Sequence, residues 1–183
     1  MSGIVAVLSI AAATAITGAL LVWSWAAFGP RSVGFALLIV WLPMTWLGTI
    51  SRLVTPRLPA QYHRLRAWEL DGRIYERLGV RTIKWLLRRG PLAVFNPHLH
   101  LPRDRTPHHL ARLEQRMRDA EASHAILLVA TLPVVAHALA RSWWVAAGAT
   151  IVFDVGINGY PVMLQRYNRA LLRRRFPDVF TAA

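Results

Sequence analysis

The chain has 183 residues, a formal net charge of +13 and a mean hydropathy of +0.34, and 55% of its residues are hydrophobic. Apolar residues in long blocks argue against a soluble domain and are typical of a polytopic membrane protein with basic parts outside the bilayer. The chain contains no cysteine, which excludes disulfide bonds, a thiolate nucleophile and a Cys-ligated metal. Its positive charge lies beside the apolar blocks, so we expect membrane lipids and no nucleic acid among its partners.

Residues 4–28 carry no charged side chain and predict a first transmembrane helix. At 1.5 Å per residue, a helix of this length crosses the ~30 Å of hydrocarbon in a bilayer. The segment lacks the positive start and the short apolar core of a signal peptide. A tight turn at residues 29–32 leads into a second predicted span at residues 33–50, in which Pro43 predicts a kink.

A long basic segment follows at residues 51–121. Within it, residues 64–78 have helical spacing with aromatic and aliphatic side chains on one face, and residues 80–87 are too short to span. Both stretches predict amphipathic helices that lie in the membrane interface. Prolines predict a loop at residues 95–102, and Thr106 before Pro107 predicts the start of another helix.

Two more spans are predicted at residues 122–140, which Pro133 should bend, and at residues 143–160. A basic tail follows at residues 161–183, with a frayed end. The predicted fold class is therefore all-α: a single membrane domain over residues 1–183 with four transmembrane helices and cytoplasmic interfacial helices.

The distribution of Lys and Arg predicts the orientation. Fifteen of the 22 basic residues lie in residues 51–118 and five in the tail, whereas each short turn holds one, Arg31 or Arg141. The positive-inside rule then places both termini, the middle segment and the active site on the cytoplasmic side of the inner membrane.

Glu121 and His124 are three residues apart at the start of the third span, which stacks both side chains on one face of a helix. A carboxylate beside an imidazole can orient the ring and raise its basicity, as in a general base that activates a hydroxyl. The other interpretation is that Glu121 is a charge at the helix entry and His124 an interfacial histidine.

The Glu-x-x-His pattern also occurs in di-iron helical bundles, and His98, His100, His108 and His109 are near it in sequence. Such a centre needs a second Glu-x-x-His and further carboxylates, for which the sequence offers no clear set. We therefore predict no metal ligands and no cofactor, with a metal-dependent enzyme as an alternative. For His98 and His100 the simpler interpretation is an ordinary pair in a loop.

Asp154 lies inside the fourth span, where an ionised carboxylate costs several kcal/mol. It either holds a polar group of a substrate or bonds a neighbouring helix. Glu69, with Arg66 and Arg73 nearby, is consistent with a simple helical charge network. The sequence has no nucleotide-binding fingerprint, no GxSxG and no His-x4-Asp acyltransferase motif.

Directly after the fourth span come Gln165, Arg166, Tyr167, Asn168 and Arg169. Guanidinium groups match phosphate oxygens and amides match hydroxyls, so this mixture indicates recognition of phosphates or sugars at the bilayer surface. The alternative is a positive-inside stop signal with an interfacial tyrosine.

These elements together resemble a known family over about residues 65–175. The most specific part is the Gln165–Arg169 pentapeptide, and the others are Trp68-Glu69, Gly72-Arg73, Tyr75, Leu78-Gly79-Val80-Arg81, Lys84-Trp85, Glu121-x-x-His124 and Leu132-Pro133. The chain resembles the glycosyl-4,4'-diaponeurosporenoate acyltransferases of the staphyloxanthin pathway. It departs from them at Ala170, where Arg-Pro-Arg is expected after Tyr-Asn, and at Leu86, where a lysine is common.

The resemblance implies a membrane enzyme that moves a fatty acyl group from a cytosolic thioester, with acyl-CoA as co-substrate, to a sugar hydroxyl of a lipid-linked glycoside such as a glycosylated carotenoid. It implies His124 as the base with Glu121 as its partner, and Arg166 and Arg169 as ligands of the donor's phosphates. It places Gln165, Tyr167 and Asn168 against the sugar or the oxyanion, and Glu69 and Trp85 at the entry. The alternative function is a non-catalytic membrane subunit that binds a partner protein or anionic lipid.

Overall fold

The computed structural model describes residues 3–51, 53–89 and 105–180. These residues form helices and connecting turns without any strand, which confirms the all-α prediction. Four helical stretches among them are long and apolar enough to cross a membrane, as predicted: Gly3–Phe28, Val33–Ile50, Pro107–Ala140 and Trp144–Arg175. The predicted loop at residues 95–102, with His98 and His100, lies outside the described residues.

The chain divides into two compact units. Unit 1 comprises Met1–Arg57 and Ala122–Gly159, and unit 2 comprises Leu58–Glu121 and Tyr160–Ala183. Each unit thus combines two separate stretches of the chain, because α5 (Pro107–Ala130) runs from unit 2 into unit 1 and the last long helical stretch returns to unit 2 at Tyr160. The single membrane domain stays a prediction.

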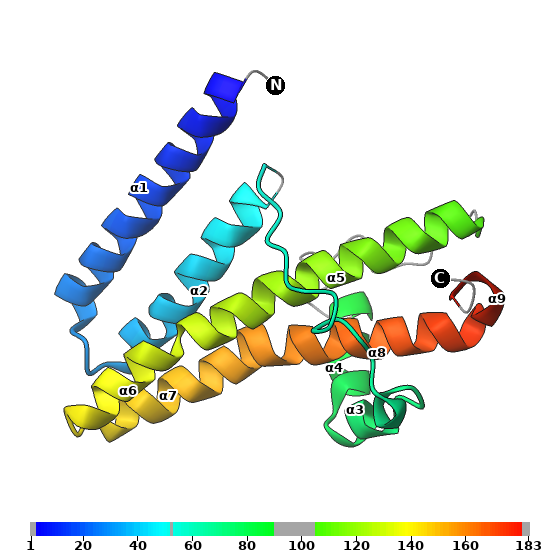
Figure 1. The fold of residues 1–183 in the computed structure, drawn as a ribbon. Coiled ribbons are helices and arrows are strands. Elements are labelled where there is room, and N and C mark those ends of the chain that lie inside the picture. The colour runs from blue at the N-terminus through cyan, green and yellow to red at the C-terminus, as the bar shows by residue number, and fades with distance from the viewer. Residues whose placement is uncertain (1–2, 52, 90–104, 181–183) are drawn as a thin grey trace. The chain divides into compact units, whose positions relative to one another are not determined.

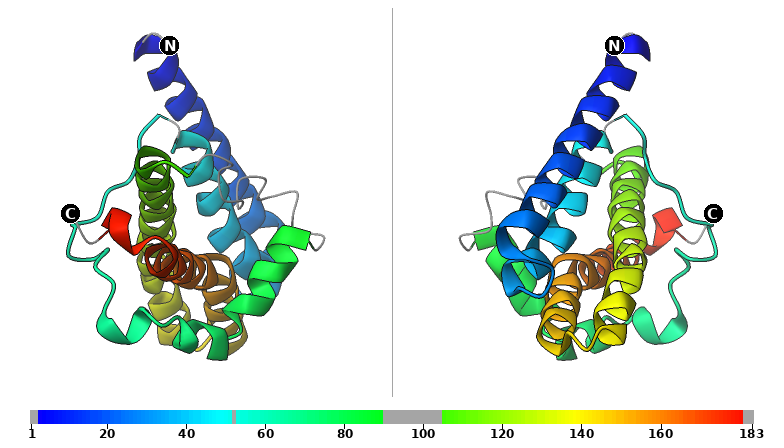
Figure 2. Two further views of the ribbon diagram at one scale, coloured as in Figure 1. Left: turned by 90° about the vertical axis from the view of Figure 1, so that its right-hand side faces the viewer. Right: turned by 90° about the vertical axis from the view of Figure 1, so that its left-hand side faces the viewer.

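Unit 1 consists largely of two helical hairpins. In the first, α1 (Gly3–Phe28) and α2 (Val33–Ile50) are joined at the predicted turn, where the Ser32 hydroxyl caps α2 by accepting from the Phe35 N–H at 3.0 Å (Figure 1). In the second, α6 (Leu132–Ala140) and α7 (Trp144–Asp154) lie side by side (Figure 2). Helix α2 runs through Pro43, whereas Pro133 lies in the first turn of α6, where α5 has ended.

The core of unit 1 is apolar. Leu47 and Ile50 of α2 pack against Leu127 of α5, and the Trp46 indole donates to the Thr14 hydroxyl of α1 at 2.9 Å. Much of α1 is exposed, including Ile4, Val7 and Val22. Such a surface suits a helix that faces lipid.

A turn of π-helix, Val155–Gly159, follows α7 and leads directly into α8 (Tyr160–Arg175). Pro161 lies just after this turn, has no N–H to donate and would press its ring against the carbonyl of Ile157 in a regular helix. The widened turn removes that conflict. The helix continues to Arg175, so most of the predicted basic tail is helical, and the end of the fourth span at residue 160 stays a prediction.

In unit 2, short elements pack against the long helix α8. These are η1 (Ala67–Glu69), α3 (Arg73–Arg77) and α4 (Val80–Arg89), with α9 (Pro177–Phe180) at the end of the chain (Figure 1). Tyr75 and Val80 form an apolar core with Leu164 and Tyr167 of α8. Helix α4 confirms the predicted amphipathic helix at residues 80–87.

The prediction of one continuous helix over residues 64–78 is wrong. Gly72 adopts a left-handed conformation with φ +74°, which separates η1 from α3. Tyr75 faces the core, while Trp68 and Leu78, which were expected on the same face, are about half exposed. Within residues 64–78, only the short stretch of α3 forms an α-helix.

Candidate functional site

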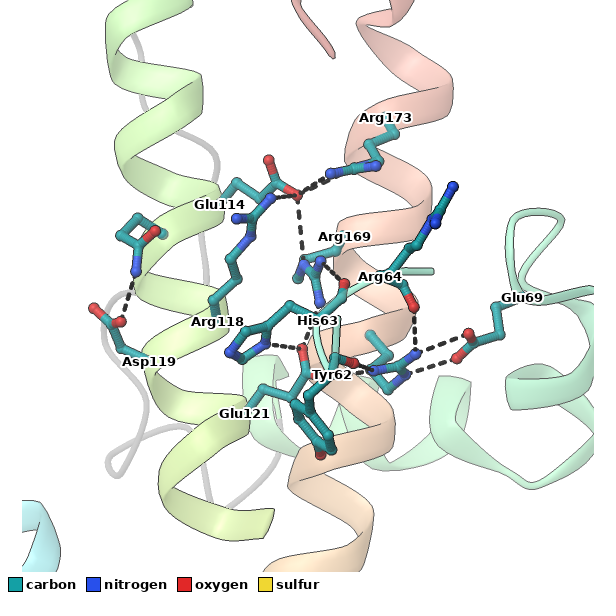
Figure 3. Close-up of polar contacts among 12 residues, drawn as sticks. Tyr62, His63, Arg64, Glu69, Glu114, Arg118, Asp119, Glu121, Arg169 and Arg173 are labelled. Atoms are coloured by element: carbon teal, nitrogen blue, oxygen red, sulfur yellow. Dashed lines mark hydrogen bonds and ion pairs between the residues drawn. The ribbon is translucent and has the colours of Figure 1, made fainter. Parts of the chain in front are cut away.

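Helices α5 and α8 carry opposite charges at helical spacing. Arg166, Arg169 and Arg173 follow one another at intervals of three and four residues in α8, and Glu114 and Glu121 are two turns apart in α5. Together with Glu69 they form what we call the arginine–glutamate cluster of unit 2 (Figure 3).

Arg166 has a partner for every N–H of its guanidinium. Its Nε and Nη2 bind the two oxygens of Glu69 at 2.6 and 2.8 Å, and its Nη1 binds Glu121 Oε1 at 2.7 Å. The remaining N–H groups donate to the carbonyls of Tyr62 and Arg64 at 3.0 and 3.2 Å. Through these bonds Arg166 links three separate chain segments. Only 14% of its side chain is exposed, so water competes little for the hydrogen bonds.

Arg169 is fully buried and bridges two carboxylates. Its Nη1 donates to Glu121 Oε2 at 2.5 Å and its Nη2 to the His63 carbonyl, and its Nε lies 3.5 Å from Glu114 Oε1. Glu114 in turn binds Arg173 at 2.8 Å and Arg118 at 3.2 Å. Figure 3 shows Arg169 between Glu114 and Glu121, so that positive and negative groups alternate along the cluster.

Glu69 is almost completely buried and accepts from several donors. Burial by itself raises the pKa of the Glu69 carboxyl, but hydrogen bonds from Arg166, the Tyr75 hydroxyl and the Arg66 N–H outweigh this effect and lower the pKa to about 2. Burial and the neighbouring Glu69 carboxylate raise the pKa of Tyr75 above its usual value. Glu69 is therefore held ionised against Arg166, and its predicted place at the entry stays a prediction.

Tyr167 of α8 packs in the apolar core of unit 2 beside Tyr75 of α3. Its hydroxyl donates to Glu76 Oε1 at 2.7 Å, and the Lys84 ammonium lies 5.1 Å from the centre of its ring. Gly72 approaches the same ring so closely that a Cβ there would stand 3.0 Å from the Tyr167 Cε2 atom. These contacts fix the ring in one position.

His124 of α5 belongs to unit 1, where it begins a chain of polar groups. His124 Nδ1 lies 3.1 Å from Asn158 Oδ1, and Asn158 Nδ2 donates to Asp154 Oδ1 at 2.7 Å. Asn158 is fully buried in the π-helical turn, and Asp154 is 4% exposed. We call these residues the His–Asn–Asp chain. A π-helical turn inside a helix is a frequent feature of functional sites.

The Asn158 amide fixes the tautomer of His124. Its nitrogen donates to the Asp154 carboxylate, so its oxygen faces His124 and can only accept. With the amide in this orientation the imidazole proton is on Nδ1, and Nε2, which has no hydrogen-bond partner among the described residues, carries the lone pair that can accept a proton. This is the arrangement required of a general base held by a neutral side chain.

The structure brings several predicted residues together and assigns others elsewhere. Glu69, Glu121, Arg166 and Arg169 meet in the arginine–glutamate cluster. Glu121 bonds arginines and His124 bonds Asn158, so their predicted partnership on one helix face stays a prediction.

The remaining predicted residues have less contact with the cluster. Asn168 is buried, Gln165 is half-buried, and Trp85 is exposed on α4. Their roles, and that of Asp154 toward a substrate, also stay predictions.

Sequence reasoning missed Asn158, Glu114, Arg173 and Tyr75. Two of them carried a signal: Asn158 stands four residues after Asp154 in an apolar span, and Glu114 stands two helical turns before Glu121. Over residues 3–51, 53–89 and 105–180, no group of three or more His, Cys, Asp or Glu side chains is placed to hold a metal ion. The exposed His108 and His109 instead bond Arg112 and Thr106.

Comparison with known proteins gives one family match. The family model described as glycosyl-4,4'-diaponeurosporenoate acyltransferase matches residues 59–176, which include both the arginine–glutamate cluster and the His–Asn–Asp chain. No curated protein and no solved structure matches the chain significantly. Since the family model covers more than half of the sequence, the chain belongs to the glycosyl-4,4'-diaponeurosporenoate acyltransferase family.

Proposed function

We propose that this chain transfers a fatty acyl group from a cytosolic thioester, such as acyl-CoA, to a sugar hydroxyl of a lipid-linked glycoside, such as a glycosylated carotenoid. Family membership supports acyl transfer, and the four long apolar helices support an acceptor that resides in the membrane. The observation that carries the mechanism is the hydrogen bond between His124 and Asn158, because it leaves His124 Nε2 as a free proton acceptor.

In the proposed reaction, His124 Nε2 takes the proton of the sugar hydroxyl while the oxygen attacks the thioester carbonyl. The tetrahedral intermediate then collapses, the C–S bond breaks and the ester forms. The leaving thiolate takes the proton back from His124, which restores the neutral imidazole. Asn158 and Asp154 hold the ring in one tautomer throughout and are positioning residues.

Glu121 has a different role in this proposal. Each of its oxygens already accepts from a guanidinium, at 2.7 Å from Arg166 and 2.5 Å from Arg169. A carboxylate with both oxygens engaged is poorly placed to relay a proton, so we assign Glu121 to holding the two arginines.

The arginines of the cluster are engaged in the same way. Arg166 has all its N–H groups bonded, and Arg169 is sealed from solvent. Binding the phosphates of the donor would require both to give up buried carboxylates. We therefore propose that both arginines shape unit 2 and do not bind the donor's phosphates.

The activity test uses the purified full-length chain with acyl-CoA and a glycolipid acceptor. We expect His124→Ala to lower kcat about 10²- to 10⁴-fold, the usual share of a general base. Asn158→Leu should lower kcat and also change the pH–rate profile, because the ring is no longer held in one tautomer. His108→Ala is the matched control, because His108 is exposed on the same helix; it should leave turnover unchanged.

The outcomes separate the alternatives. Turnover by His124→Ala within a few-fold of wild type would remove the assigned base. Absence of any product from the wild-type chain would favour a non-catalytic membrane subunit, and stoichiometric metal in elemental analysis would favour a metal-dependent enzyme. Mass spectrometry of lipids from cells that lack or overproduce the chain would then identify the acceptor.

A further inference from the structure

Two arginines, one in each helix-connecting turn of unit 1, lie against the ring of Trp143. Arg31 follows α1 and Arg141 follows α6, and their guanidinium carbons lie 5.3 and 5.9 Å from the centre of the Trp143 ring. Both arginines are exposed. Both positive charges therefore lie against the same indole ring, which attracts each of them.

Nothing acidic neutralises these charges within unit 1. The stretches that form unit 1 contain one carboxylate in their sequence, Asp154, and it is bonded to Asn158. Among the residues that the structure describes, neither Arg31 nor Arg141 has an ion-pair partner. A paired, uncompensated set of guanidinium groups at the end of membrane helices is suited to a phosphate ligand.

An apolar cavity of about 610 Å³ lies in the same unit, a volume typical of ligand pockets. Its walls come from three helices and include Leu21, Trp25, Phe35, Ile39, Val134 and His137. Trp25 is 51% exposed, so the cavity is open on that side. The wall residue His137 stacks edge-on against Trp143 at 5.5 Å, which connects the cavity to the two arginines.

We propose that this end of unit 1 binds an anionic phospholipid. The phosphate lies between Arg31 and Arg141, the Trp143 indole lies at headgroup depth, and one acyl chain fills the cavity. A headgroup without an ammonium is preferred, because the site has two positive charges and no carboxylate to receive one. The site is independent of the proposed acyl transfer and of the His–Asn–Asp chain.

The headgroup is tested by native mass spectrometry of the detergent-purified full chain with dioleoyl phosphatidylglycerol or dioleoyl phosphatidylcholine. We expect phosphatidylglycerol to be retained more strongly. Arg31→Ala and Arg141→Ala should each weaken its binding about fivefold, the effect of one basic residue at an anionic surface. Arg57→Ala is the matched control, an exposed arginine of unit 1 outside the turns, and it should bind like wild type.

The acyl-chain pocket is tested by Val134→Trp, which fills the cavity and keeps both arginines. It should weaken phosphatidylglycerol binding, and Ile39→Phe serves as a second filler if that variant unfolds in detergent. The proposal is overturned if both lipids bind equally, if Arg57→Ala loses as much as the turn variants, or if folded cavity-filling variants bind like wild type.

Discussion

At the scale of single residues, Arg169 stands out in unit 2 because its charged side chain is fully buried. A guanidinium that is withdrawn from water depends on protein partners, and Arg169 donates to Glu121 and to the His63 carbonyl, while its Nε has no hydrogen bond and lies 3.5 Å from the Glu114 carboxylate. Such a pair contributes little net stability when it is complete, but its half-removal is costly because the other charge stays buried. The cluster therefore specifies which segments of unit 2 meet.

We expect Arg169→Ala to destabilise the protein by about 3–5 kcal/mol, since Glu121 would keep a buried charge with one guanidinium fewer. Arg175→Ala, in the exposed last turn of the same helix, should change stability by less than about 0.5 kcal/mol. Thermal unfolding in detergent measures both. Equal unfolding temperatures for the two variants would contradict the assignment of a structural cluster.

Glu69 predicts an acid transition. Its pKa is about 2 in the folded state and near 4.5 when unfolded, so its contribution is fully present above about pH 4.5 and is lost as the pH falls toward 2. The loss amounts to about 3 kcal/mol on this shift. Unfolding temperatures measured from pH 5 to pH 2 should fall less steeply for Glu69→Gln, which has no proton to bind. If the unfolding temperatures of wild type and Glu69→Gln fall in parallel with pH, Glu69 is not the source of the acid transition.

At the scale of elements, Gly72 and the π-helical turn decide how the helices pass into one another. Gly72 ends η1 in a left-handed conformation and lets the backbone approach the Tyr167 ring. The π-helical turn lies just ahead of Pro161 and buries Asn158. The glycine thus makes room for the Tyr167 ring, and the π-helical turn directs the Asn158 side chain into the interior of unit 1.

Gly72→Ala should destabilise the protein by more than the roughly 1–2 kcal/mol of left-handed strain, because its Cβ would also press on Tyr167. Gly79 is a matched control, since it has φ +77° but no atom within 4 Å of an added Cβ. Chemical denaturation of both variants separates strain from contact. If Gly79→Ala costs as much as Gly72→Ala, the approach to Tyr167 is not what requires glycine.

At the scale of the whole molecule, the family match includes both the arginine–glutamate cluster and the His–Asn–Asp chain. The family match begins at residue 59, after α1 and α2, and ends at residue 176, just past α8. Most of unit 2 and the unit 1 helices that carry His124, Asp154 and Asn158 lie within it. The two N-terminal spans lie before it, and they supply much of the wall of the proposed lipid cavity.

The orientation is open to a direct test, because the chain has no native cysteine. We propose that both termini are cytoplasmic, as the basic segments predict. In whole cells, a membrane-impermeant maleimide should then label Ser142→Cys in the short turn and spare Asp178→Cys near the C-terminus. Permeabilised cells should show labelling of both. The reverse pattern would invert the topology.

The sequence by itself determined the all-helical fold and the four long apolar helices. Hydropathy and charge are properties of contiguous residues, so the four spans, the helix α4 and the start of α5 at Pro107 could be predicted from the chain alone. The candidate residues Glu121, Arg166 and Arg169 were found from their spacing and their position beside apolar spans, and the family resemblance added a role for Glu69.

Only the tertiary structure decided what these residues do. Glu69 and Arg166 are 97 positions apart, and their pairing depends on the left-handed turn at Gly72 and on the packing of α3 and α4 on α8. His124 acquired Asn158 as its partner because a π-helical turn, invisible to a 3.6-residue period, rotates that amide into the interior of unit 1. Burial and hydrogen-bond partners are properties of the folded chain. The sequence suggests phosphate binding for Arg166 and Arg169, whereas the folded chain pairs both guanidinium groups with the buried carboxylate of Glu121.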